Sequence, residues 1–162
     1  MSETRAWQDV TSLVCRWAVA GVFLYACIDK IIDPAAFAQN IDNYRMVPLV
    51  LLHPFAWLLP IAELVIAIAL IVGWQTRGAA LLASLLTVVF IIAIATALIR
   101  DLDISCGCFH TDSGSTVGRD LLLRDLVLLA GALVPVWLGP GRWSLDRWRG
   151  IEGVRAGTLQ NP

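Results

Sequence analysis

Residues 78–99 read GAALLASLLTVVFIIAIATALI, a run without a charged side chain that is bracketed by Arg77 and Arg100. A helix needs about 20 mostly apolar residues to cross the hydrocarbon core of a bilayer. A strand of a membrane β-barrel would instead alternate polar and apolar residues, and this run does not alternate. The stretch therefore predicts a transmembrane helix and makes lipid the solvent of this chain.

Three further apolar runs predict helices of the same kind, over residues 10–32, 52–74 and 117–138. Glu63 interrupts the second of these runs, and Arg124 lies near the start of the last one. The predicted fold class is all-α: an integral membrane four-transmembrane-helix bundle.

The composition agrees with one membrane domain. The chain has 162 residues, of which 58% are hydrophobic and 15% charged, whereas soluble domains carry about 25% charged residues. We expect residues 1–150 to form the four-helix membrane domain and residues 151–162 to be a disordered cytoplasmic tail. A net charge of -1 without a basic patch gives no indication of nucleic-acid binding.

A short helix is predicted between the first two spans. Asp33 followed by Pro34 is typical of a helix start, with an N-cap residue and proline at the first helical position. Phe37, Ile41 and Tyr44 then share one face at helical spacing. We expect an interfacial helix on the outer membrane surface.

The arginine distribution predicts the orientation in the membrane. Four spans place both termini on one side, together with the loop around Arg77. That side collects Arg5, Arg77, Arg142, Arg147, Arg149 and Arg155, against Lys30, Arg45, Arg100 and Arg119 on the other. Cytoplasmic loops carry the excess of positive charge, so we expect cytoplasmic termini.

Cys106-Gly107-Cys108 follows the third span and should therefore lie outside the cytoplasm, where disulfides persist. In an extended chain the α-carbons of the two cysteines stand roughly 6.5–7 Å apart, at the limit of disulfide geometry. Gly107 permits the bend that a bridge needs. Strained, exposed disulfides are the labile or catalytic ones, so the motif favours a redox-active pair.

Two other interpretations of this loop stay open. Cys106, Cys108, His110 and Asp112 alternate along the chain, and their soft sulfurs suit copper(I) or zinc, as in a metal-handling membrane protein. Alternatively, the two cysteines are free thiols or a staple in a non-catalytic membrane subunit. A redox pair should be reducible, a metal site should retain metal, and a staple should affect stability rather than activity.

Two cysteines lie in the first span. Cys27 is near its outer end and is a candidate third thiol, although a buried free cysteine commonly serves as a small apolar filler. Cys15 is twelve residues earlier, about 18 Å deeper by helix rise, and cannot bridge Cys27.

Charged residues inside spans usually face the bundle interior and pair with one another. We expect Glu63 to pair with Arg124 or Lys30, with Arg16 as a weaker candidate. The pair could simply fix the bundle. It could also form a polar pocket beneath the cysteine loop, which would hold a quinone head group or favour a thiolate.

Over residues from about 10 to 138, the chain resembles the MauE group of the DoxX-like membrane proteins. The resemblance is carried by Gly21-Val22-Phe23-Leu24, Lys30, Asp33-Pro34-Ala35-Ala36-Phe37, Tyr44, Pro48, Pro60, Glu63, Gly73, Cys106-Gly107-Cys108-Phe109 and Arg124-Asp125. His110 departs from the pattern, which usually has glycine there, and Cys27 stands where small residues are common.

The resemblance implies a four-helix protein of the bacterial inner membrane that assists methylamine utilisation. The implied client is a periplasmic protein rich in disulfides, such as the methylamine dehydrogenase small subunit, reached directly or through a thioredoxin-like partner. The family is also distantly similar to the four-helix core of vitamin K epoxide reductase and bacterial disulfide oxidases. By this likeness Cys106 and Cys108 form the redox pair, while Lys30, Glu63 and Arg124 match the pattern without a firm role. Those oxidases use two cysteine pairs, so the single pair here would need direct contact with quinone or a partner.

Overall fold

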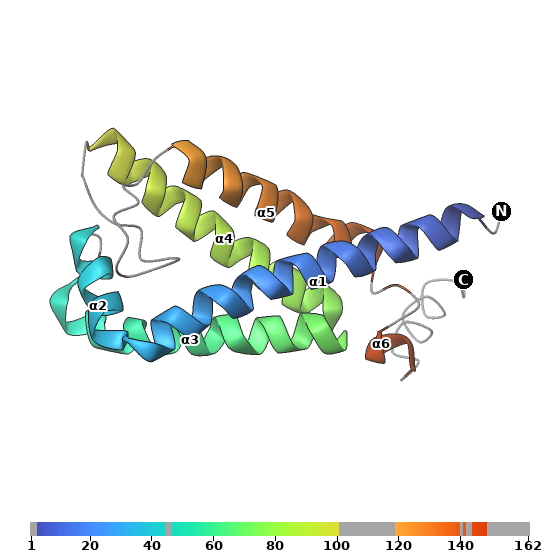
Figure 1. Ribbon diagram of the computed structural model, residues 1–162, viewed down its shortest axis with the longest axis horizontal. Coiled ribbons are helices and arrows are strands. Elements are labelled where there is room, and N and C mark those ends of the chain that lie inside the picture. The colour runs from blue at the N-terminus through green and yellow to red at the C-terminus, as the bar shows by residue number, and fades with distance from the viewer. Residues whose placement is uncertain (1–2, 45–46, 101–118, 140, 142–143, 149–162) are drawn as a thin grey trace, which may run out of the picture.

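The computed structural model describes residues 3–44, 47–100, 119–139, 141 and 144–148, and within them the regular structure is entirely helical (Figure 1). The helices are α1 (Glu3–Ile32), α2 (Pro34–Asn43), α3 (Leu49–Val72), α4 (Thr76–Ile99), α5 (Arg119–Leu138) and α6 (Leu145–Trp148). Four of these, α1, α3, α4 and α5, are long and apolar enough to cross a membrane. The predicted all-α bundle of four spanning helices is confirmed. The predicted tail, residues 151–162, lies outside the described residues.

The helix boundaries differ from the predicted ones by a few residues, for local reasons. α3 begins at Leu49, directly after Pro48, and ends at Val72, because Gly73 adopts the left-handed conformation with φ +75°. The Gly73 N–H donates to the carbonyl of Ala69, which closes the helix. Trp74, predicted to end this span, therefore belongs to the turn that leads into α4.

The four long helices form a closed ring in chain order. α1 packs against α3 and α5, and α4 packs against the same two helices. Figure 1 shows α1 beside α3 and α4 beside α5, with the two pairs diverging toward the end that carries α2. α1 begins and α5 ends at the opposite end, beside α6.

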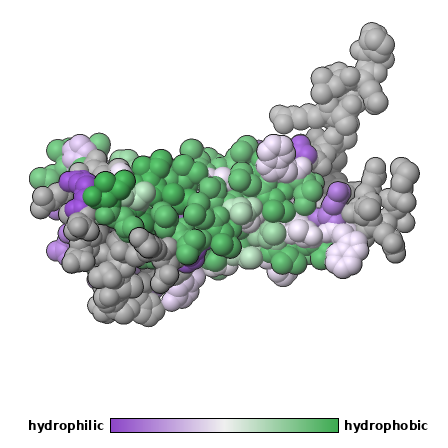
Figure 2. Space-filling view, turned by 90° about the horizontal axis from the view of Figure 1, so that it is seen from above, coloured by the Kyte–Doolittle hydropathy of each residue, from purple (hydrophilic) through white to green (hydrophobic). Residues whose placement is uncertain are grey.

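The core of the ring consists mainly of small side chains. Ala20, Ala67, Ala80, Ala83 and Ala132 come from all four helices, and each is at most 1% exposed. In a membrane, helices associate through close backbone approach rather than the hydrophobic effect, and small residues permit that approach. Most of the large apolar side chains instead face outward, and on the face shown in Figure 2 hydrophobic residues cover the middle of the molecule, with hydrophilic residues toward its ends.

The predicted short helix α2 is confirmed together with its cap. The Asp33 carboxylate accepts a hydrogen bond from the Ala36 N–H at 2.9 Å, and Pro34 occupies the first turn. Phe37 and Ala38 pack against Leu52 of α3. The apolar face of α2 is thus committed to α3, and its position at a membrane surface stays a prediction.

The short helix α6 was not anticipated from the sequence, and it fastens the other end of the bundle. Its Asp146 carboxylate accepts hydrogen bonds from the backbone N–H groups of Gln75 and Thr76, each at 2.7 Å. The Asp146 N–H in turn donates to the Gly73 carbonyl at 3.1 Å. A carboxylate at a helix N-terminus satisfies otherwise unpaired donors, so α6 caps α4 from outside.

Candidate functional site

A buried ion pair joins α1 to α3 in the half of the bundle nearer α2. The Lys30 ammonium lies 2.5 Å from Glu63 Oε1, and both residues are 1% exposed. The predicted pairing of Glu63 with a cation is confirmed, and the partner is Lys30. Arg16 lies near the opposite end, where it interacts electrostatically with Asp146.

Two aromatic rings from other helices complete the surroundings of Lys30. Its ammonium lies 5.2 Å from the ring centroid of Phe37 on α2 and 4.9 Å from that of Phe90 on α4. Cations over ring faces at these distances are attracted by the aromatic quadrupole. Four helices therefore meet at one positive charge, which could not be kept unpaired in lipid.

The two carboxylate oxygens of Glu63 differ in their hydrogen bonding. Oε2 is buried and has no hydrogen-bond partner among the described residues. Buried polar atoms normally find a partner, in the protein or in ordered water. This oxygen is therefore the atom of the cluster that is available to a further donor.

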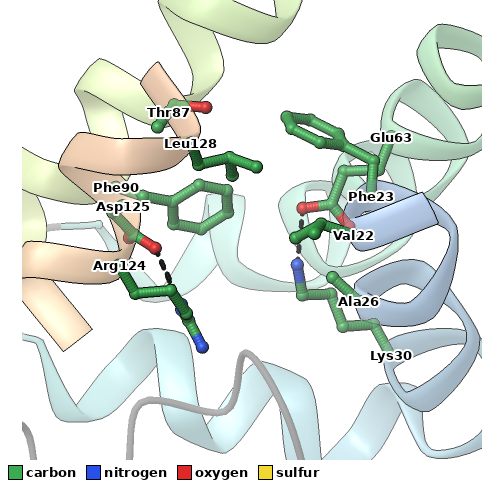
Figure 3. A pocket seen from close by; sticks show the side chains of 10 residues that line it. All are labelled: Val22, Phe23, Ala26, Lys30, Glu63, Thr87, Phe90, Arg124, Asp125 and Leu128. Atoms are coloured by element: carbon green, nitrogen blue, oxygen red, sulfur yellow. Dashed lines mark hydrogen bonds and ion pairs between the residues drawn. The ribbon is translucent and has the colours of Figure 1, made fainter. Parts of the chain in front are cut away.

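A second charged pair faces the first across the bundle. On α5, Arg124 Nε and Nη2 lie 3.1 and 3.0 Å from Asp125 Oδ1. The Asp125 side chain is 6% exposed and that of Arg124 is 37% exposed. Figure 3 shows this pair opposite the Lys30–Glu63 pair, with the ring of Phe90 between them.

The space between the two pairs is a small cavity of about 30 Å³. Its described lining residues include all three side chains predicted to form a polar pocket: Lys30, Glu63 and Arg124. This volume is enough for about one water molecule, given two to four polar partners. The cavity can hold one water molecule next to Glu63. The quinone head group predicted from the sequence stays a prediction.

Two of the four cysteines, Cys15 and Cys27, lie among the residues that the structure describes. Cys27 is fully buried, and its Sγ donates to the Leu24 carbonyl at 3.1 Å, while Cys15 is half-buried. Both are free thiols. Cys106 and Cys108, with the neighbouring His110 and Asp112, lie outside the described residues. Within the described part of the chain, no three His, Cys, Asp or Glu side chains gather as a metal site.

Sequence reasoning did not single out Phe90 and Thr87, which line the charged cavity, or Phe37, whose ring faces Lys30. Thr87 carried a weak signal, because it is one of few polar residues in the apolar run of the third span. Phe37 was assigned only to the apolar face of the short helix. Phe90 carried no signal, since an aromatic residue in an apolar span is equally consistent with contact to lipid.

Comparison with known proteins identifies the family of this chain. Residues 8–138 match the model of the family described as methylamine utilisation protein MauE. The chain is 32% identical over 152 residues to the methylamine utilization protein MauE of Paracoccus denitrificans, covering 93% of this chain and 82% of the relative. It is 38% identical over 117 residues to the protein of that name from Methylophilus methylotrophus, covering 71% of this chain and 62% of the relative.

A third relative, the MauE protein of Paracoccus versutus, is 33% identical over 153 residues, covering 88% of this chain and 80% of the relative. No solved structure matches the chain. The family model spans all four membrane helices, including the residues that form both charged pairs. This chain, a multi-pass membrane protein, belongs to the MauE family.

Proposed function

We propose that this protein is an inner-membrane thiol–disulfide factor that serves methylamine utilisation by maturing a periplasmic client. The observation that carries the proposal is the Cys106-Gly107-Cys108 motif, set between two spanning helices of a chain whose relatives are named for methylamine utilisation. The proposed client is a disulfide-rich protein such as the small subunit of methylamine dehydrogenase, with a thioredoxin-like protein as a further partner.

The positions of the described helices support this proposal. α4 ends at Ile99 and α5 begins at Arg119, both at the end of the bundle that carries α2. The two helix ends that flank the cysteine motif in the sequence are thus at the same end of the bundle as the charged cavity. A nearby cation lowers the pKa of a cysteine thiol and raises its thiolate fraction, and Arg124 is the more exposed of the cavity's two cations.

The proposed reaction is a thiol–disulfide exchange between the client and the cysteine pair. A client thiolate attacks the Cys106–Cys108 bond, a second client thiolate resolves the mixed disulfide, and a client disulfide forms. Two electrons and two protons pass from the client to Cys106 and Cys108. We propose that a membrane quinone, or the disulfide of a thioredoxin-like partner, accepts them and restores the bond.

Growth on methylamine and thiol alkylation test the proposal together. In a strain that depends on this protein for methylamine growth, Cys106→Ser and Cys108→Ser should each stop growth while the protein accumulates normally. In intact cells, the alkylation mass shift of these two thiols should appear only after mild reductant. A single-serine variant should also trap a mixed disulfide with the client.

The control is Cys15→Ser, which removes a half-buried thiol near the middle of α1, twelve residues before Cys27, and should leave growth unchanged. Cys27→Ala asks whether this buried thiol takes part, because loss of growth at normal abundance would make it a third redox thiol. If Cys106 and Cys108 are fully alkylated without reductant and the double-serine strain still grows on methylamine, the redox role is wrong.

A further inference from the structure

A second cavity, much larger than the charged one, lies between α2, α3 and α4. Its volume is about 370 Å³. Among the described lining residues only Asn40 and Tyr44 are polar, and the rest are apolar, including Phe55, Leu59 and Ala93. Genuinely apolar cavities stay dry or take up apolar ligands, so water is a poor occupant.

The cavity lies in the half of α4 that ends at Arg100. Its described lining on this helix runs from Val89 to Ala93, and Arg100 follows the last residue of the helix. By helix rise, Val89 is about 16 Å from Arg100, so the cavity and this cation lie within about half of the roughly 30 Å hydrocarbon core. Val89 and Ile92 are about half exposed, so the cavity opens sideways toward the lipid-facing surface.

A cation is hydrogen-bonded to one of the residues that line this cavity. The Arg100 Nη1 donates to the backbone carbonyl of Tyr44 at 3.3 Å, and Tyr44 is one of the lining residues. Arg100 is exposed, and its guanidinium has five N–H donors, of which this bond uses one. A planar guanidinium at the membrane edge suits a phosphate group.

We propose that this cavity holds one acyl chain of an anionic phospholipid, with the lipid phosphate bound by Arg100. The acyl chain fits the apolar walls of the cavity, and the phosphate matches the positive charge of Arg100, which lies next to the lining residue Tyr44. This site is separate from the proposed redox chemistry and does not depend on it.

A bound acyl chain would contact two aromatic rings that also belong to the surroundings of Lys30. Phe37 and Phe90 line this cavity, and the same two rings face the Lys30 ammonium. α2 packs on α1 and α3, so a chain filling the space toward α4 would hold the Phe37 and Phe90 rings in place. Lipid occupancy should therefore stabilise the folded bundle as a whole.

The test uses the purified full chain in detergent, with thermal unfolding and native mass spectrometry as measurements. Phosphatidylglycerol should raise the unfolding midpoint saturably, by about 5 °C at excess lipid. Phosphatidylcholine should do so less, and one lipid should stay bound per chain. In Arg100→Gln the two lipids should act equally, because the phosphate partner is lost while the apolar cavity remains.

Val89→Trp should block the cavity and abolish the shift, whereas Leu85→Trp is the matched control. Leu85 is one turn away on the same helix, equally lipid-facing, and outside the described lining. Ala93→Phe provides a second block from deeper in the cavity. An equal shift in the parent, Val89→Trp and Ala93→Phe would overturn the proposal. So would a saturable shift with a short-chain ubiquinone but none with phosphatidylglycerol, which would make the occupant a quinone.

Discussion

Lys30 and Glu63 form a buried ion pair between α1 and α3, yet only one of the two carboxylate oxygens is used. The pair is enclosed by Phe37 and Phe90, so neither charge has access to bulk water. Removing one partner would leave the other charge buried and uncompensated. The pair is consequently a sensitive point for stability as well as for the proposed chemistry.

Glu63→Gln should destabilise the bundle by about 3–5 kcal/mol, the usual cost of leaving a buried charge unpaired. The measurement is the thermal unfolding midpoint in detergent. The double variant Lys30→Met with Glu63→Met should recover most of that loss, because a buried pair can be replaced by apolar residues of similar volume.

The comparison for this cycle is Arg124→Gln. The Arg124 side chain is 37% exposed, so water screens its charge, whereas the Asp125 carboxylate that loses this partner is 6% exposed. The loss of stability should therefore be smaller than that of Glu63→Gln. If the losses of the single variants Lys30→Met and Glu63→Met simply add in the double variant, Lys30 and Glu63 are not coupled. If Glu63→Gln is as heat-resistant as the parent but inactive, the carboxylate acts in chemistry rather than in folding.

Gly73→Ala should destabilise the turn between α3 and α4 by about 1–3 kcal/mol, the cost of a non-glycine residue held in a left-handed conformation. The added Cβ would also lie 2.8 Å from the Ser144 Cα, which is backbone and cannot easily move. Gly78→Ala is the matched control. Its Cβ meets no atom closer than 3.8 Å, and alanine favours helix, so a gain of about 0.5–1 kcal/mol is expected. Comparable unfolding midpoints for the two variants would contradict this account of the turn.

Asp146→Ala tests whether α6 fastens the bundle. It removes the acceptor of two backbone hydrogen bonds at the α4 N-terminus and should lower stability by about 1–3 kcal/mol. Asp146→Asn, which keeps one acceptor oxygen, should fall between the parent and the alanine variant. Asp42→Ala changes an exposed carboxylate of α2 and should stay within about 0.5 kcal/mol of the parent. Equal midpoints for Asp146→Ala and Asp42→Ala would mean that the cap contributes nothing.

The contrast between Glu63 and Asp146 shows what the sequence could and could not predict. A carboxylate inside an apolar span must be paired, so the ion pair of Glu63 followed from the cost of a bare charge in lipid. The choice of Lys30 over Arg124 depended on how α1 and α5 are rotated about their axes. The charge pattern does not specify that rotation.

Asp146 lies in a polar stretch of ordinary composition, and its partners Gln75 and Thr76 are some 70 positions earlier. A capping contact over that distance has no local signature, in contrast to Asp33, which caps a helix that starts at the next residue. Apolar cavities cannot be predicted from the sequence either, because apolar residues such as Val89 and Ala93 are equally expected on a surface that faces lipid. The positions of the spans were therefore predictable, and the apolar cavity between α2, α3 and α4 was not.

The membrane orientation is the remaining prediction: both termini should be cytoplasmic, with the cysteine motif on the opposite side. The structure strengthens the charge argument, because Lys30 was counted among the four outer positive charges and is in fact neutralised by Glu63 inside the bundle. Six basic residues then stand against three. Arg77 is exposed in the first turn of α4, as a retained cytoplasmic charge should be.

A fluorescent reporter that folds only in the cytoplasm should be fluorescent when it is fused after Pro162. A reporter that is active only in the periplasm should be inactive at the same position. Arg77→Glu should weaken the preference and produce a mixed population, whereas Lys30→Met should leave the orientation unchanged, because a buried, paired lysine contributes no flanking charge. The Lys30→Met variant is the more informative one. It distinguishes a count of all basic residues in the sequence from a count of only those that the structure leaves unneutralised. A Lys30→Met protein that inverts as readily as Arg77→Glu would show that the buried lysine does act as a topological signal.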